Sequence, residues 1–159
     1  ARPVNQFHGK IRFSMYILYR KVSDYDGPSL FLGLFDAQDQ AERQRLQYRL
    51  VLEKQDPWQN QSYREVDLGN DLVIMPIKGE CADRQKVYLI SCYSEGFGQI
   101  IREFQRVCGD RAQAESIAKK LEDDDESSFP NWALIDEVTV NQFVVPDYNK
   151  WRDGSYDGE

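Results

Sequence analysis

Apolar and polar residues alternate with a period of two in the first part of the chain. From Lys10 to Arg20 this alternation predicts a long, half-buried β-strand. The residues on its apolar face are Ile11, Phe13, Met15, Ile17 and Tyr19. The following segment, SLFLGLF, is apolar on both faces and predicts a central strand that is covered on both sides. Gly33 in the middle of this segment indicates a bulge or a close neighbour.

The segment that follows Asp36 supports two interpretations. Its second half alternates, which predicts a third strand, whereas a helix from about Ala37 to Leu50 is the alternative. The inward residues of the predicted strand are Leu46, Tyr48, Leu50 and Leu52. Two short buried strands follow in DLVIMPIKG and KVYLISCY, and Pro76 restricts the first of them to a sheet edge or a bulge.

After Ser94 the apolar period becomes helical. The apolar residues fall at the spacing of one helix face, and Gly109 ends this predicted helix. They are Ile100, Ile101, Phe104, Val107 and Cys108. Asp110 with Gln113 three residues later is a capping-box pattern, which predicts the start of a second helix. That helix ends near Lys120, because the acidic run EDDDESS opposes the helix dipole. NWALIDEVTVNQFVV returns to strand composition.

These elements predict an α+β, strand-rich fold. An antiparallel β-sheet or sandwich covers residues 10–93, two helices of the C-terminal half lie within 97–121, and a final strand covers 132–145. A chain of 159 residues is long enough to bury one core, so we expect a single globular domain over residues 10–145. Residues 1–9 form an N-terminal extension and residues 146–159 a C-terminal tail in this interpretation.

Composition and charge limit the kinds of partner that we expect the protein to bind. The net charge of −7 argues against nucleic acid, whose phosphates are bound by clustered Lys and Arg, and against an anionic membrane surface. No apolar run reaches the length of a membrane span, and the N-terminus carries no signal-peptide pattern. We therefore expect a cytoplasmic or nuclear protein. Its three cysteines, Cys81, Cys92 and Cys108, match no zinc spacing and are predicted to be thiols.

The stretch SDYDGPSLFLGLFDAQ could open a calcium loop or form a turn. A calcium loop needs glycine at its sixth position and glutamate at its twelfth. Counted from Asp24, glycine stands at the fourth position and Phe35 at the twelfth, and apolar residues occupy ligand positions. Asp and Gly are ordinary turn residues, so we expect a turn, with no metal and no cofactor.

No catalytic constellation is predicted. The only histidine is His8, and no nucleophile elbow is present. SEGFGQII resembles a phosphate loop only in Gly96 and Gly98, and is interpreted as a strand-to-helix turn. The acidic candidates for acid–base work are Glu103, residues 123–126, Asp136 and Glu137, and the sequence brings no two of them together.

Aromatic residues in polar surroundings are the best candidates for a partner site. Trp58 and Trp151 lie in polar segments and Phe97 lies between glycines, and aromatic side chains dominate binding hot spots. Packing of a loop Trp over the core is the alternative. The leading hypothesis is a non-catalytic protein-interaction module, an adaptor or recognition domain that binds a protein or peptide strand at a sheet edge. The rival is a small-molecule binder or enzyme with a pocket between the sheet and the helices.

Three segments carry a family resemblance: FSMYILYRKVSDYDG, SLFLGLFDAQDQAE and YRLVLEK. Over about Phe13–Leu52, a quarter of the chain, their order and spacing resemble the TRAF-like substrate-binding domain of the Seven-in-absentia ubiquitin ligases. The zinc-binding cysteines upstream of that domain are absent, and the sequence from Ser94 onward departs from the pattern. The resemblance implies an antiparallel sandwich that captures extended peptides without catalysis, and it assigns no individual binding residue.

Overall fold

The computed structural model describes residues 4–7, 10–13, 15–21, 28–55, 72–79, 86–97, 99–125 and 131–144. The elements are β1 (Val4–Phe7), β2 (Lys10–Phe13), β3 (Met15–Arg20), β4 (Leu30–Phe35), α1 (Gln38–Gln55), β5 (Leu72–Ile77), β6 (Lys86–Gly96), β7 (Gln99–Cys108), α2 (Arg111–Asp123), β8 (Asn131–Thr139) and β9 (Gln142–Phe143). The predicted fold class, α+β and strand-rich with antiparallel sheets, two helices and a final strand, is confirmed.

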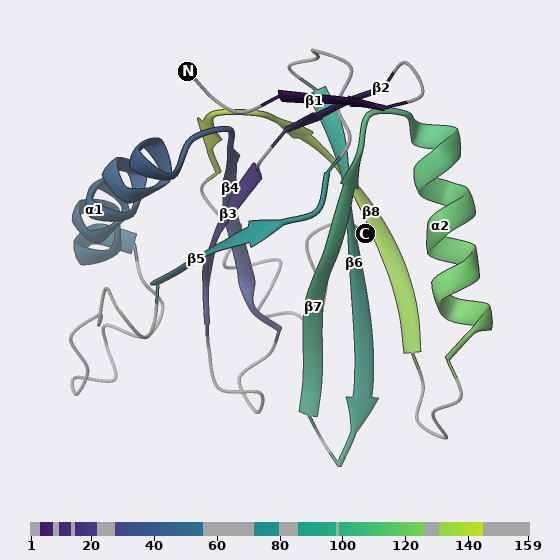
Figure 1. Cartoon of the computed structure of the whole chain (residues 1–159). Coiled ribbons are helices and arrows are strands. Elements are labelled where there is room, and N and C mark those ends of the chain that lie inside the picture. The colour runs from purple at the N-terminus through teal and green to yellow at the C-terminus, as the bar shows by residue number, and fades with distance from the viewer. Residues whose placement is uncertain are drawn as a thin grey trace.

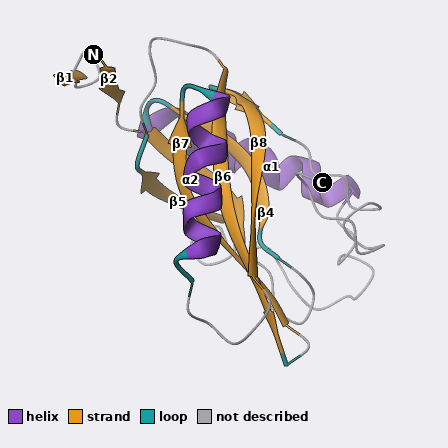
Figure 2. Ribbon diagram, turned by 90° about the vertical axis from the view of Figure 1, so that its right-hand side faces the viewer, coloured by secondary structure: helices purple, strands orange, loops and turns teal. Residues whose placement is uncertain are grey.

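The two helices and two main sheets form four layers (Figure 1). A four-stranded sheet in the order β5-β3-β4-β9 faces a three-stranded sheet in the order β7-β6-β8, and β1 pairs with β2 separately. All pairings between the described strands are antiparallel. Helix α1 covers the outside of the four-stranded sheet and α2 the outside of the three-stranded sheet, as Figure 2 shows from the side of α2.

Three apolar clusters hold these layers together. The largest lies between the sheets and consists of Met15, Ile17, Phe31, Leu34, Ile77, Val87, Leu89, Phe104, Val107 and Val138. A second cluster packs Ala41 of α1 against Leu18, Leu32, Phe35 and Leu72. The third packs Ala114 and Ala118 of α2 against Ile90 and Cys108. Burial of these side chains is the main stabilising contribution to the fold, because apolar area leaves water.

Each of the two main sheets contains a bulge that shifts the period of its apolar residues. In β7 the register skips Gln105, so Phe104 and Val107 both face the core between the sheets although they are three residues apart. In β4 the register skips Leu32 in the same way, next to Gly33. A Cβ at Gly33 would lie 2.7 Å from the Phe35 ring, so the predicted bulge and close neighbour at this glycine are both confirmed.

The bulge in β7 explains why the predicted helix over residues 100–108 is wrong. This segment is β7, the second strand of a long hairpin with β6. Apolar residues at a spacing of three and four normally indicate a helix face. Here the extra residue produces that spacing within a strand, with Phe104 and Val107 facing one sheet and Cys108 facing α2. The glycine-flanked turn at Phe97 therefore joins two strands, and not a strand and a helix.

The third strand predicted around Leu46–Leu52 is also wrong. These residues belong to α1, so the alternative interpretation of this segment was the right one. Its Gln, Glu, Arg, Leu and Ala residues favour helix, and Asp39 pairs with Arg43 one turn later at 3.7 Å. Leu46, expected to point inward, is 59% exposed, whereas Ala41 is fully buried on the face towards β3 and β4.

Other elements follow the sequence more closely. The predicted strands in DLVIMPIKG and KVYLISCY are β5 and β6, and β5 lies at a sheet edge, as Pro76 requires. Asp110 caps α2 by accepting a hydrogen bond from the Ala112 amide at 3.2 Å. The helix continues to Asp123, three residues further than expected, and the final strand divides into β8 and β9 at Asn141.

The predicted strand from Lys10 to Arg20 also differs in two respects. Its residues form β2 and β3, which belong to different sheets. The face of β3 that carries Tyr16 and Leu18, expected to face water, packs against α1, so β3 is covered on both sides. Among the described residues, no helix has the length and apolarity needed to cross a membrane.

Candidate functional site

The β6–β7 hairpin extends beyond the other strands and ends in Phe97 (Figure 1). Phe97 is 88% exposed, which is the highest exposed fraction among the large apolar residues that the structure describes. Its backbone φ of 53° lies in the left-handed region, which is unfavourable for a residue with a bulky side chain. A strained and exposed aromatic residue at a hairpin tip is a candidate contact for a partner.

The outer edge of β7 is open along most of its length. Strand β7 pairs with β6 on one side. On its other side, the described residues provide one bridge, from Gly79 to Val107, where the Val107 amide donates to the Lys78 carbonyl at 2.8 Å. From Gln99 to Gln105 the outer backbone groups thus lack a strand partner within the described part of the chain, over about 20 Å. Such an edge can accept an added strand.

A groove adjoins the upper end of this edge. It lies between β5, β7 and the C-terminal half of α2 and has a volume of about 670 Å³. Its apolar lining consists of Met75, Pro76, Ile77, Phe104, Ile117 and Leu121. Because Gln105 and Arg106 of β7 also line it, a strand added along β7 would run directly into this groove. We call it the β5–β7–α2 groove.

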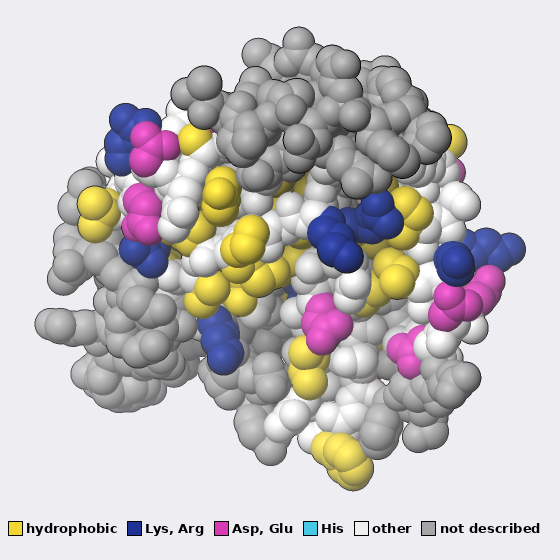
Figure 3. Space-filling view, viewed as in Figure 1, with side chains coloured by type: hydrophobic (Ala, Val, Ile, Leu, Met, Phe, Trp, Pro, Cys, Tyr) yellow, Lys and Arg dark blue, Asp and Glu magenta, His cyan; other side chains and the backbone are white. Residues whose placement is uncertain are grey.

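The charged residues of the β5–β7–α2 groove are mainly basic. Lys78, Arg106 and Lys120 line it, against the single acid Asp124. None of the three cations forms an ion pair with another described residue. The Nε atom of Arg106 is buried and has no hydrogen-bond partner among the described residues. Figure 3 shows Lys and Arg side chains lying among hydrophobic ones on this face of the protein.

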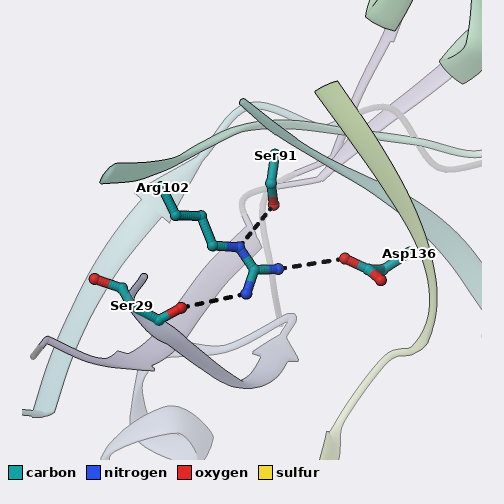
Figure 4. Close-up of polar contacts among 4 residues, drawn as sticks. All are labelled: Ser29, Ser91, Arg102 and Asp136. Carbon is teal, nitrogen blue, oxygen red and sulfur yellow. Dashed lines mark hydrogen bonds and ion pairs between the residues drawn. The ribbon is translucent and has the colours of Figure 1, made fainter. Parts of the chain in front are cut away.

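Arg102 lies four residues before Arg106 but on the inner face of β7. Its side chain is fully buried and donates to Ser91 Oγ at 3.2 Å, the Ser29 carbonyl at 3.2 Å and Asp136 Oδ2 at 3.3 Å (Figure 4). The guanidinium carbon lies 4.6 Å from the centroid of the Phe104 ring. These contacts join the two sheets, so Arg102 serves the fold and is not available to a ligand.

A second, smaller hollow lies on the other side of Leu121. It has a volume of about 130 Å³ and is lined by Cys92 with Glu103, Glu122 and Asp125. Burial, followed by the negative charges of these three residues, raises the pKa of the Cys92 thiol from 9.0 to about 11. The thiol is therefore protonated at neutral pH, which makes it a poor nucleophile.

The remaining candidates from the sequence are not brought together. The described residues do not include Trp58, Trp151, His8, Cys81 or the predicted turn at Asp24. Asp136 is engaged by Arg102, whereas Glu137 pairs with Lys86 at 3.7 Å on the opposite face of β8. Within the described part of the chain, no group of three or more His, Cys, Asp or Glu residues is placed to hold a metal ion.

The basic residues of the groove were missed by the sequence analysis. Lys78, Arg106 and Lys120 come from three separate elements, and nothing in the linear pattern links them. A helix over residues 100–108 would put Arg102 and Arg106 on one face, whereas the strand and its bulge place them on opposite faces. A prediction of the bulge at Gln105 would have placed Arg102 and Arg106 on opposite faces of the strand.

Comparison of the chain with protein-family models, with curated proteins and with solved structures yields no match. The function therefore has to be inferred from the geometry of β7 and of the groove beside it.

Proposed function

We propose that this protein is a non-catalytic interaction module that binds an extended segment of a partner protein along the outer edge of β7. The observation that carries the proposal is the open edge from Gln99 to Gln105, which ends at the β5–β7–α2 groove. A ligand strand would gain backbone hydrogen bonds from the edge, and a side chain placed in the groove would provide specificity. In this arrangement Phe97 contacts the partner at the far end of the hairpin.

The opposite edge of the three-stranded sheet is less suited to this role. Strand β8 lies there, and α2 and β4 both contact it. Within the three-stranded sheet, the β5–β7–α2 groove adjoins the β7 edge and not the β8 edge. Ile101, which is 42% exposed on β7, adds apolar area beside the same edge.

A small-molecule binder is the second candidate function. The volume of the groove, about 670 Å³, falls within the range of roughly 300–1,000 Å³ that is typical of ligand pockets. Its apolar lining and unpaired cations suit an anionic, partly apolar compound. This candidate makes no use of the open edge, and that difference separates the two functions experimentally.

A selection from a library of random ten-residue peptides tests the proposal. Peptides that bind the protein would then be N-methylated at one backbone amide at a time. Strand addition predicts that every second methylation reduces affinity at least about tenfold, because alternate amides of a strand face its neighbour. A peptide bound by its side chains alone would show no such period.

The hairpin tip is tested with the same peptides and with partners recovered by affinity purification. Phe97→Ala should weaken binding, as should Trp58→Ala or Trp151→Ala if those residues belong to the same surface. Failure to select any peptide, together with binding of a metabolite in the groove, would replace this proposal by the second candidate.

A further inference from the structure

The β5–β7–α2 groove differs in charge from the rest of the protein. The chain carries 27 acidic and 20 basic residues, yet the groove is lined by three basic residues and one acid. A solvated surface of this composition would normally intersperse both signs. In the groove, by contrast, the described residues leave Lys78, Arg106 and Lys120 without ion pairs.

Among the basic residues of the groove, Arg106 is the one with a buried hydrogen-bond donor that lacks an acceptor among the described residues. Its Nε atom is buried but has no hydrogen-bond partner within the described part of the chain. A buried N–H without an acceptor is costly, and an acceptor that enters the groove would remove that cost. Arginine favours planar acceptors such as carboxylates, which can engage two of its N–H groups at once.

The apolar lining determines what else the occupant must contain. Ile117 and Leu121 of α2 face the groove beside Phe104 of β7. A small inorganic anion would leave this apolar surface in water, whereas an aliphatic or aromatic side chain would bury it. The groove therefore suits an apolar residue and an acidic residue that are close together in one ligand.

We infer that the groove is the specificity pocket for an Asp or Glu side chain, flanked by an apolar residue, in the peptide that adds to β7. The inference rests on the proposed function and names the class of partner: an extended acidic and apolar segment of another protein. Arg106 is the principal contact of the carboxylate, and Lys78 and Lys120 stand at the rim. Asp124 and the overall negative charge disfavour peptides with acids at other positions.

Two adjacent lysines of α2 provide a matched test. Lys120 lines the groove, whereas Lys119 is also exposed but does not line it. Lys120→Glu and Lys119→Glu change the net charge by the same amount. We expect Lys120→Glu to weaken binding of the selected peptides by about tenfold, and Lys119→Glu to leave it within about twofold. Binding is measured by fluorescence anisotropy after circular dichroism has established that both variants melt as the parent protein does.

The peptide itself offers a test that does not disturb the protein. Selected peptides should share one Asp or Glu position, and replacing that residue by Asn or Gln should weaken binding by about tenfold. Equal effects of the two lysine substitutions, or selected peptides without a shared acid, would overturn the inference. If N-methylation of every second peptide amide still weakened binding, strand addition at β7 would remain supported although the acidic specificity of the groove was wrong.

Two other outcomes would also contradict this inference. Displacement of the peptide by millimolar inorganic phosphate, without any effect of N-methylation, would identify the groove as an anion pocket and remove the proposed function as well. A dimer of the protein that Lys120→Glu dissociates would identify a second copy as the occupant. Sedimentation analysis of the parent protein and of this variant distinguishes that case.

Discussion

Arg102 and Arg106 lie on opposite faces of β7, and their guanidinium groups have opposite surroundings. Arg102 is fully buried, donates to three oxygen atoms and is paired with Asp136. Arg106 lines an open groove, forms no ion pair with a described residue and has a buried Nε without an acceptor. The difference separates an arginine that holds the sheets together from one that we propose binds a carboxylate of the partner.

The bulge at Gln105 creates this difference. Without the extra residue, positions 102 and 106 would share one face of the strand, because side chains alternate with a period of two. With it, Arg106 faces the side of α2 while Phe104 and Val107 both remain in the core. Bulges often change the direction of a side chain next to a functional site, and the groove beside β7 fits that pattern.

The largest effect is expected from replacing the two arginines by methionine. Arg102→Met should destabilise the fold by about 3 kcal/mol, because it leaves the Asp136 carboxylate, 18% exposed, without its cation. Arg106→Met should change stability by less than about 1 kcal/mol. Urea denaturation followed by circular dichroism measures both. Equal losses of stability in the two variants would show that Arg106 also stabilises the fold, and the proposed difference between the two arginines would be wrong.

A smaller effect is expected at the hairpin tip. Phe97→Gly should stabilise the protein by about 1 kcal/mol, because glycine adopts the φ of 53° without strain. The same substitution should weaken partner binding, as the exposed ring is lost. Thermal denaturation and anisotropy measure the two quantities on one variant.

Asn141 is the matched control for this substitution. It also has a positive φ, of 65°, but asparagine tolerates that region, and its side chain accepts a hydrogen bond from the Asp36 amide at 3.1 Å. Asn141→Gly should therefore lower stability. A gain at Asn141, or a loss at Phe97, would mean that the backbone strain assigned to the hairpin tip is wrong.

The elements that the sequence predicted well are those with an undisturbed period. Strands β5 and β6 and the N-cap of α2 depend on local patterns that later contacts do not change. The failures occur where tertiary structure alters the period, as in β7, or where strong helix formers also alternate, as in α1. The groove depends on three elements that are distant in sequence, so no local pattern could predict it.

The smallest effect concerns Cys92, which faces the acidic hollow on the same side of the sheet as Arg106. Its pKa of about 11 predicts that alkylation by iodoacetamide, followed by mass spectrometry, accelerates up to about pH 11 in the folded protein. Since the raised pKa favours the neutral thiol, the associated stability is present below pH 9 and is lost as the pH rises through 11.

Removing one of the nearby charges should lower this pKa. Glu103→Gln should accelerate alkylation of Cys92 at pH 9, because less negative charge opposes the thiolate. Glu115→Gln, on α2 and paired with Arg111, should leave the rate unchanged. If both variants reacted at the rate of the parent protein, the acidic hollow would not influence the thiol.

Hydrogen exchange of the β7 backbone is a direct test of strand addition at this edge. Exchange is measured residue by residue, by NMR, with and without a selected peptide. If the peptide adds to β7, it should slow exchange of alternate amides of β7 between Gln99 and Gln105, while the amides of β8, at the other edge of the same sheet, exchange as before. Protection confined to α2, or equal protection at β8, would contradict strand addition at β7.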